Sequence, residues 1–171
     1  MVYGTVMILR PSDSSDAAPP FELADEAATG RLAAALAGLA RPGDTIALWG
    51  ELGAGKTTFA RAFIRSLGGG PDVPSPTFTL VQAYDLDAFA VWHFDLYRLS
   101  APEAAYELGI EEAFAQGVSL IEWPERLGSL LPTDRLDVSL DFGADESRRR
   151  VSLLGHGSWR ARLAEARLER T

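Results

Sequence analysis

The chain has 171 residues, of which 47% are hydrophobic and 23% are charged, a balance typical of one folded domain with a buried core. It contains no cysteine, which excludes disulfides, thiolate metal sites and a cysteine nucleophile. The formal net charge of −8 argues against strong direct binding to nucleic acid, because such binding depends on clustered positive charge.

The first residues carry no targeting pattern. Residues 1–10 lack the basic start and apolar centre of a secretory signal, and no apolar run reaches the ~20 residues that a membrane span needs. We therefore expect a cytoplasmic protein without membrane contact. Residues 11–20 are rich in Ser, Asp, Ala and Pro, so we expect residues 1–20 to form a flexible tail before one domain at 21–171.

Three elements are expected before the first glycine-rich segment. Residues 21–23 form a short strand, and Asp25 is the N-cap of a helix over 26–39, where apolar residues recur at helical spacing. After a turn at 41–44, the apolar residues 45–49 form a buried strand.

The segment Gly50–Thr58 matches the phosphate-loop pattern, a glycine, four variable residues and then Gly-Lys-Thr. The strand before it and a helix expected over 59–67 supply the required context. Such a loop turns backbone N–H groups toward one anion, and the helix start adds the positive end of its dipole. Lys56 is predicted to reach the β- and γ-phosphates, and the Thr57 hydroxyl is predicted to hold Mg²⁺.

Lys56 is also the only lysine in the chain, since every other basic side chain is an arginine. A compact ammonium fits among phosphates where a planar guanidinium does not. The alternative, a glycine-rich turn that binds nothing, is disfavoured because the motif and its flanking elements agree.

Residues 72–80 form a loop with two prolines and with threonines on either side of Phe78. In many phosphate-loop NTPases, the loop after the first helix covers the γ-phosphate and moves on hydrolysis, so Ser75 to Thr79 is a candidate switch loop. A rigid connector with a buried Phe78 is the alternative, and spacing alone does not separate the two.

Two acidic residues follow expected strands. Strands at 80–84 and 90–94 flank a turn at 85–87, and the second strand leads to Asp95. Short helices are expected at 102–108 and 110–115, and a buried strand at 118–121 leads to Glu122. Parallel sheets bind ligands at the carboxyl ends of their strands, so both acids are candidates for the metal or the attacking water. The alternative is that each acid pairs with Arg98 or Arg126.

The remaining elements complete the expected fold. Residues 136–142 alternate as a half-buried strand that pairs with 151–154 through a turn at 143–145, and 159–170 form an amphipathic helix. Arg148, Arg149 and Arg150 are interpreted as a solvated turn or strand end. The two histidines are expected to stand alone, with His93 packed beside the strand that carries Asp95. The pattern predicts an α/β single-domain P-loop NTPase, with a mostly parallel central sheet flanked by helices and an antiparallel edge.

Four functions are compatible with this pattern. They are a Mg-ATPase, a small-molecule kinase, a GTP-binding switch, and a nucleotide-dependent binding module whose hydrolysis is incidental. The chain lacks asparagine, which the guanine-reading Asn-Lys-x-Asp motif requires, and no arginine-rich lid marks a kinase. No arginine finger is identified either.

Four segments together resemble one family, the bacterial ATPase of tRNA threonylcarbamoyladenosine biosynthesis called TsaE (formerly YjeE). They are Gly50–Phe59, Ser75–Val81, His93–Leu99 and Ile121–Glu125. They occur in the family's order, and the resemblance covers about residues 21–142. It implies a protein that binds ATP and Mg²⁺, hydrolyses ATP weakly alone, and works with TsaB and TsaD. Those partners modify adenosine 37 of tRNA, so tRNA is reached only through the complex.

The resemblance also implies roles for single residues. Thr57 and Glu122 would hold Mg²⁺, while Asp95 and Lys56 would support hydrolysis. Ala24 and Glu26 are weaker candidates, in a stretch that resembles the family's segment near the adenine. The phosphates would be cradled by Gly53, Ala54, Gly55, Lys56, Thr57 and Thr58.

Overall fold

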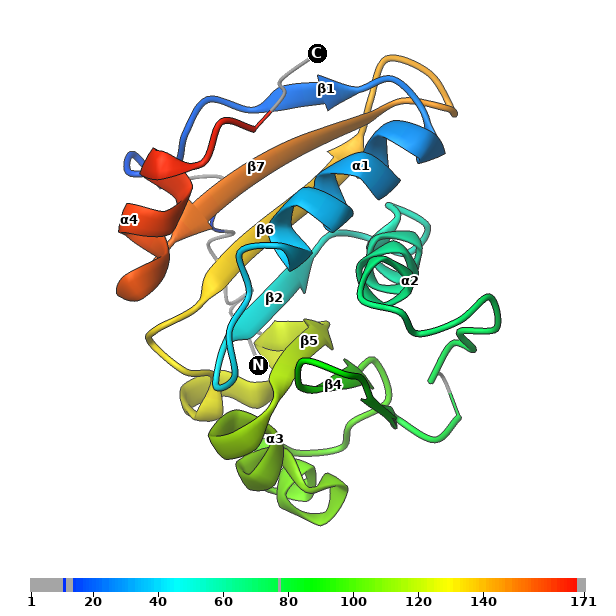
Figure 1. Ribbon diagram of the computed structural model, residues 1–171, viewed down its shortest axis with the longest axis vertical. Helices are drawn as coiled ribbons and strands as arrows, with labels where there is room; N and C mark the ends of the chain where they lie inside the picture. Colours follow the sequence, from blue (N-terminus) through cyan, green and yellow to red (C-terminus); the bar gives the residue numbers. More distant parts are fainter. Residues whose placement is uncertain (1–10, 12–13, 77, 169–171) are drawn as a thin grey trace, which may run out of the picture.

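A seven-stranded mixed sheet organises the chain, in the strand order β1-β7-β6-β2-β5-β4-β3 (Figure 1). It is seen in a computed structural model that describes residues 11, 14–76 and 78–168. The central strands β6, β2, β5 and β4 are parallel to one another. Strands β7 and β1 at one edge and β3 at the other pair antiparallel. The predicted α/β architecture is thus confirmed, with antiparallel strands at both edges instead of one.

The elements follow the sequence pattern closely. The strands are Phe21–Leu23 (β1), Thr45–Trp49 (β2), Val81–Asp85 (β3), Ala90–Asp95 (β4), Val118–Glu122 (β5), Leu136–Phe142 (β6) and Arg149–Gly155 (β7). The helices are Glu26–Ala37 (α1), Lys56–Ser66 (α2), Ile110–Gln116 (α3) and Ser158–Glu165 (α4), with 3-10 segments at Pro102–Leu108 (η2) and Pro124–Leu130 (η3). Strands β2 and β5 are buried at every position, which explains their mostly apolar sequences.

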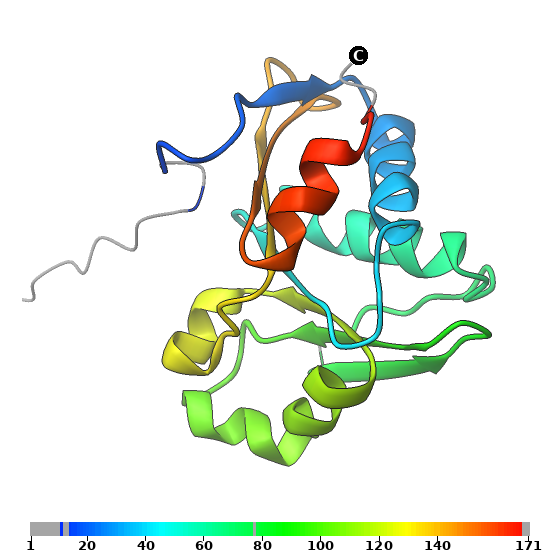
Figure 2. The same ribbon diagram turned by 60° about the vertical axis from the view of Figure 1, so that its left-hand side comes forward.

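Helices cover both faces of the sheet (Figure 2). One hydrophobic cluster joins α1, α2 and α4 to one face, and a second joins η2, α3 and η3 to the other. Successive side chains of a strand point to opposite faces, so Leu120 of β5 belongs to the first cluster and Ile121 to the second. The phosphate loop lies on the α2 side of the sheet.

The ends of several helices differ from the sequence prediction. Asp25 is the N-cap of α1 as expected, since its Oδ1 accepts a hydrogen bond of 2.8 Å from the Ala28 N–H. Helix α2 begins at Lys56 instead of residue 59, because Gly55 ends the loop in a left-handed conformation with φ 108°. Helix α4 ends at Glu165, because extended backbone at Ala166 lets Leu168 pack on the core.

The chain ends are described only in part. The flexible tail expected over residues 1–20 falls largely on residues 1–10 and 12–13, which lie outside the described residues. Within the part of the chain that the structure describes, no helix has the length and apolar character required to cross a membrane.

Candidate nucleotide-binding site

The phosphate loop connects the end of β2 to the start of α2 and passes close to β6. A Cβ atom on Gly50 would lie 2.5 Å from the carbonyl oxygen of Leu140, so only glycine fits at this point. Gly55 precedes α2 in a conformation that side chains disfavour. The loop therefore ends at a helix N-terminus, whose first N–H groups have no partner within the helix.

Lys56 folds back into this loop. Its side chain is only 4% exposed, and its Nζ donates hydrogen bonds to the carbonyl oxygens of Gly50 (2.6 Å) and Glu51 (2.9 Å). The same ammonium lies 4.1 Å from the centroid of the Trp123 ring. The only lysine of the chain is thus held at the base of a cleft.

Thr57 and Glu122 meet because β5 lies beside β2, with Glu122 opposite Leu48. The Thr57 hydroxyl lies 2.9 Å from Oε1 and 3.0 Å from Oε2 of Glu122, which is 3% exposed. These hard oxygen atoms are the kind of ligand that Mg²⁺ prefers. The described residues contain no group of three His, Cys, Asp or Glu side chains able to hold a metal alone. Mg²⁺ sites often use one or two protein ligands, with substrate phosphates and water completing the coordination.

Asp95 lies next to Glu122 because β4 and β5 are parallel neighbours with these residues opposite each other. Asp95 is 7% exposed, and its Oδ1 accepts a hydrogen bond of 3.2 Å from the Tyr97 N–H. Burial raises the pKa of Asp95 above its ordinary value, and the negative charge of Glu122 raises it further. A carboxylate with a raised pKa beside a phosphate loop is a candidate proton acceptor.

The two arginines proposed as alternative partners of these acids contact aromatic rings. The guanidinium of Arg98 lies 5.4 Å from the Phe78 ring centroid, and that of Arg126 lies 6.0 Å from the Tyr97 ring centroid. Glu122 contacts Thr57 and His93 instead.

A cleft of about 400 Å³ brings most of the predicted site residues together. Residues of the phosphate loop, the two acids and the aromatic side chains that follow the acids all line this cleft. Its lining is Leu52, Gly53, Gly55, Lys56, Thr57, Thr58, Asp95, Tyr97, Arg98, Glu122 and Trp123. The volume and the mixture of donors, carboxylates and aromatic rings fit a phosphorylated ligand with its metal.

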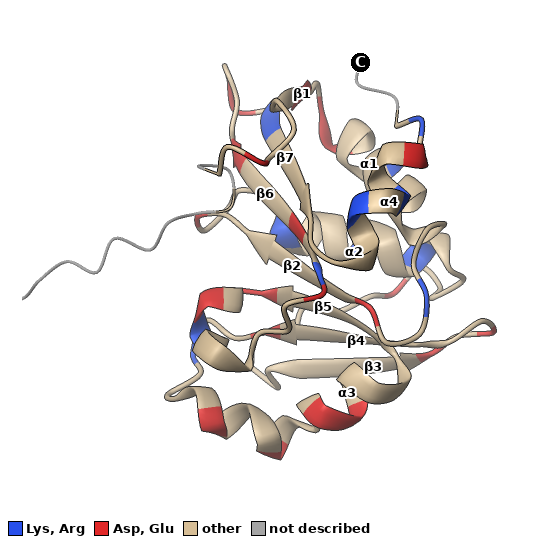
Figure 3. Cartoon of the chain, turned by 90° about the vertical axis from the view of Figure 1, so that its left-hand side faces the viewer, with Lys and Arg blue, Asp and Glu red and all other residues tan. Residues whose placement is uncertain are grey.

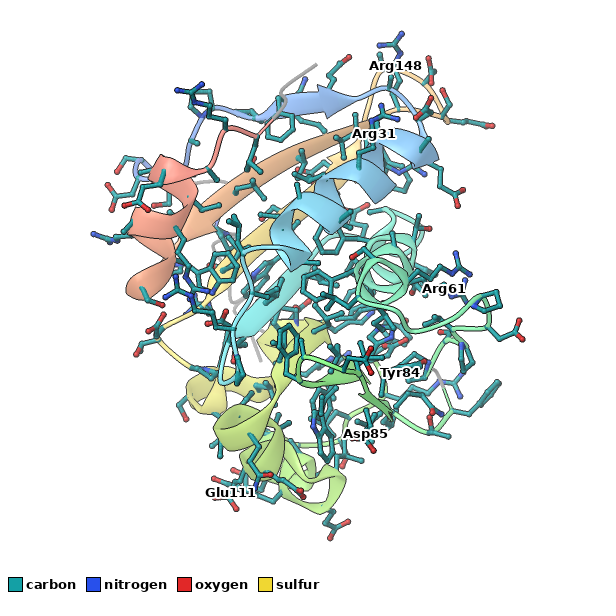
Figure 4. The ribbon with its side chains drawn as sticks, viewed as in Figure 1. Arg31, Arg61, Tyr84, Asp85, Glu111 and Arg148 are labelled. Atoms are coloured by element: carbon teal, nitrogen blue, oxygen red, sulfur yellow. The ribbon has the colours of Figure 1, made fainter. Side chains whose placement is uncertain are left out.

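The candidate switch loop ends beside Asp95. The Leu80 carbonyl oxygen accepts a hydrogen bond of 3.0 Å from the Asp95 N–H. At its other end, Arg61 of α2, labelled in Figure 4, donates to the Val73 carbonyl oxygen at 2.8 Å. Phe78 is 85% exposed, so the alternative of a connector with a buried Phe78 is wrong. Thr77, within the predicted switch loop, lies outside the described residues.

Backbone strain gathers at this site. Two non-glycine residues in the described part of the chain have positive φ, Leu80 at 63° and Trp123 at 58°. Leu80 bonds to the backbone of Asp95, and Trp123 directly follows Glu122. Bulky side chains rarely adopt this conformation, and such residues cluster at functional sites.

A second cavity, of about 240 Å³, adjoins the phosphate loop on the side of α1. Glu26 and Thr29 of α1 line it with Gly55, Thr58 and Arg149. Of the two weaker candidates for the adenine, Glu26 therefore lies beside the loop, whereas Ala24 is not part of this lining.

Two contacts of this site were missed by sequence reasoning. Arg149 of β7 donates to the carbonyl oxygens of Ala54 (3.0 Å) and Gly53 (3.3 Å), although the arginine cluster was interpreted as solvated. His93, within the strand expected at 90–94, was expected to stand alone, but its Nε2 lies 2.8 Å from Glu122 Oε1. The one signal for His93 in the sequence was its position two residues before Asp95, because residues two apart in a strand point to the same face of the sheet.

Comparison with known proteins gives one family. The family model described as "Threonylcarbamoyl adenosine biosynthesis protein TsaE" matches residues 23–151. A relative from Rickettsia felis, "tRNA threonylcarbamoyladenosine biosynthesis protein TsaE", is 42% identical over 137 residues, which cover 80% of each chain. A relative of the same name from Bacillus subtilis is 39% identical over 121 residues, covering 70% of this chain and 75% of the relative.

A solved structure agrees with this result. The crystal structure of Bacillus subtilis YdiB superposes with a TM-score of 0.72 at 30% sequence identity. The match covers 89% of this chain and 95% of YdiB.

Proposed function

Because the chain belongs to the TsaE family of tRNA threonylcarbamoyladenosine biosynthesis proteins, we propose that its part in that pathway is to bind ATP with Mg²⁺ and to hydrolyse it slowly. One observation carries the proposal. A phosphate loop with a buried lysine faces two acids from neighbouring strands, and one of those acids accepts the hydrogen bond of the Thr57 hydroxyl.

The phosphates bind along the loop. The N–H groups from Gly53 to Thr58 surround the phosphate oxygens, and the Lys56 ammonium turns from its loop carbonyls to the β- and γ-phosphates. The nucleoside occupies the second cavity, between the first turn of α1 and Arg149. Glu26 then lies near the base, in agreement with the family resemblance.

Thr57 and Glu122 hold the metal, and Asp95 supports hydrolysis. When bound, Mg²⁺ neutralises charge on the β- and γ-oxygens. Asp95 accepts a hydrogen bond from the attacking water and orients it, and its raised pKa makes it a better proton acceptor than an exposed aspartate. Arg98 is the one arginine that lines the larger cleft, and it contacts Phe78 of the candidate switch loop. Because this arginine is engaged by Phe78, hydrolysis by the protein alone is slow until partners complete the site.

The partners are TsaD and TsaB, with tRNA reached through them. Two exposed hydrophobic side chains line the cleft, Leu52 (75%) and Tyr97 (46%), and exposed Phe78 (85%) contacts Arg98 of the same lining. A partner that covers these side chains also encloses the nucleotide. Direct binding of tRNA is weak, because the net charge is −8. Figure 3 shows acidic residues spread over many elements, α3 among them, with the less numerous basic residues scattered between them.

Titration calorimetry tests nucleotide binding. We expect Mg-ATP to bind the wild-type protein and Lys56→Ala to lose at least about 100-fold in affinity, because charge-assisted contacts to phosphate are removed from a buried site. Arg65→Ala, on the same helix, is the control and keeps full affinity. Equal binding of Mg-ATP by wild type and Lys56→Ala would contradict the proposal.

A pull-down tests the partners. Immobilised protein is incubated with purified TsaB and TsaD, with ATP and Mg²⁺ or without them. We expect more TsaD to be retained with ATP, and phosphate release to rise when both partners are present. Retention of neither protein under any condition would exclude the proposed complex.

A further inference from the structure

His93 is the most deeply buried titratable side chain at the site, and the roles given so far do not use it. Its exposed fraction is 0%, and its Nε2 lies 2.8 Å from Glu122 Oε1. We propose that His93 is a positioning residue, which holds the Glu122 carboxylate in the orientation that Mg²⁺ binding requires. This inference rests on the proposed metal role of Glu122.

The carboxylate of Glu122 is held from two sides. Thr57, in the first turn of α2, lies 2.9 and 3.0 Å from its two oxygens, and His93 of β4 approaches Oε1. One contact comes from a helix and the other from the neighbouring parallel strand, so the two together fix the plane of the carboxylate. The Thr57 hydroxyl alone has one hydrogen to donate and holds the carboxylate from one side only.

The surroundings of Nδ1, the other ring nitrogen of His93, indicate where the ring carries its hydrogen. His93 Nδ1 is buried and has no hydrogen-bond partner among the described residues. A buried N–H without an acceptor is costly, more so in a charged ring, whereas a lone pair in apolar surroundings is tolerated better. We therefore place a hydrogen on Nε2, which donates to Oε1 of Glu122.

The position of Glu122 explains why a second donor is needed. Asp95 lies opposite it on β4, and like charges repel. The Thr57 hydroxyl must also direct a lone pair to the metal while it donates its hydrogen bond to Glu122. If the Glu122 carboxylate rotated away, it would lose the hydrogen bond from Thr57, and both residues would bind Mg²⁺ less well. Groups behind metal ligands commonly change metal affinity about 10- to 100-fold when removed.

The test compares ATP binding with Mg²⁺ and with EDTA. His93→Leu removes the donor and keeps an apolar side chain, whereas His93→Gln retains an N–H at a similar reach. Val91→Ala is the matched control, since Val91 is fully buried on the same face of β4 two residues away. We expect His93→Leu to need about 10- to 100-fold more Mg²⁺ for half-maximal ATP binding. Affinity in EDTA stays unchanged, and both His93→Gln and Val91→Ala remain near wild type.

Two results would overturn the inference. His93→Leu with wild-type Mg²⁺ dependence would show that the contact has no positioning role. An equal loss in His93→Leu and Val91→Ala would show that burial alone matters. A wild-type protein that binds ATP equally well with Mg²⁺ and with EDTA would instead contradict the proposed function, so the two failures are distinguishable.

A second measurement needs no variant that might disturb folding at position 93. The chain has two histidines, so ¹⁵N spectra of the imidazole rings are simple, and His156→Gln assigns the signals. We expect a hydrogen of His93 on Nε2. A hydrogen on Nδ1 alone would overturn the inference, because Nε2 then has nothing to donate to Glu122.

Discussion

Asp95 illustrates a conflict between stability and function at a single residue. Burial and the nearby charge of Glu122 raise its folded-state pKa, so its ionised form destabilises the fold at neutral pH. The stability that the acid form contributes is present below the ordinary value of 3.8 and is lost as the pH rises through the raised pKa. Functional sites often retain such unfavourable groups.

We therefore predict that Asp95→Asn melts at a higher temperature than wild type at about pH 7, because the amide carries no charge. The difference should close as the pH falls through the raised pKa of Asp95 and below the ordinary value of 3.8, where the carboxyl is protonated in both the folded and the unfolded chain. Phosphate release should fall about 100-fold, while ATP is still bound. Thermal melts in EDTA across this pH range and a phosphate assay measure the two effects.

Asp87→Asn is the control, since this carboxylate is exposed in the β3–β4 turn. It should alter neither the melting temperature nor phosphate release. A lower melting temperature for Asp95→Asn at neutral pH would mean that the ionised carboxylate stabilises the fold.

At the scale of elements, the β6–β7 hairpin supports the phosphate loop. Arg149, at the start of β7, donates to the carbonyl oxygens of Gly53 and Ala54 and lies 5.2 Å from the Phe142 ring centroid. These contacts connect the β6–β7 hairpin to the phosphate loop, and Arg149 and Ala54 lie 95 residues apart in the chain.

We predict that Arg149→Ala weakens ATP binding about fivefold, which corresponds to about 1 kcal/mol of lost loop order. The change is modest because Arg149 is half-buried and solvent weakens its contacts. Titration calorimetry with Mg-ATP measures it. Arg150→Ala, with its exposed side chain on the same strand, is the control, and an equal loss in both variants would argue against a specific support.

The last helix is fixed by one buried ion pair. Arg162 of α4 donates to both oxygens of Asp44, at 2.6 and 2.7 Å, and to the Leu39 carbonyl oxygen at 3.0 Å. Its guanidinium lies 4.0 Å from the Trp159 ring centroid. Helix α4 is therefore anchored to the segment between α1 and β2, and β2 is the strand that precedes the phosphate loop.

We predict that Arg162→Ala lowers the free energy of unfolding by about 2–4 kcal/mol, because Asp44, 11% exposed, is left without its charged partner. Urea unfolding measures this loss. Arg160→Ala, exposed on the same helix, should cost less than about 0.5 kcal/mol. In a double-mutant cycle with Asp44→Ala, additive losses would mean that the two side chains do not stabilise each other.

At the scale of the whole molecule, the site joins elements from most of the chain. Strands β2, β4 and β5 supply the loop, Asp95 and Glu122, and α1 and β7 border the second cavity. A ligand that contacts all of these stabilises the folded state relative to the unfolded chain.

We predict that ATP with Mg²⁺, at 100 times its dissociation constant, stabilises the protein by about 2.7 kcal/mol and raises the melting temperature by about 5–10 °C. Differential scanning calorimetry measures the shift. Lys56→Ala, with at least about 100-fold weaker binding, should rise by no more than about 1–2 °C at the same ATP concentration. A wild-type melting temperature that ignores Mg-ATP would contradict binding at this site.

The sequence by itself determined the local features of this protein. The strand before the phosphate loop, the loop and the helix after it depend on residues only a few positions apart, and so do the Asp25 cap and the β6–β7 hairpin. Such features follow from backbone preferences and side-chain periodicity, which a single segment contains. The order of motifs also indicated the family, which the comparisons confirm.

Only the tertiary structure decided which distant residues meet. The contacts of His93 with Glu122 and of Arg149 with Ala54 span 29 and 95 residues, and they depend on strand order and register. A shift of one residue in the pairing of β4 with β5 would turn the side chains to the opposite face. The exposure of Phe78 and the end of α4 at Glu165 were likewise set by packing between segments, which periodicity within one segment does not contain.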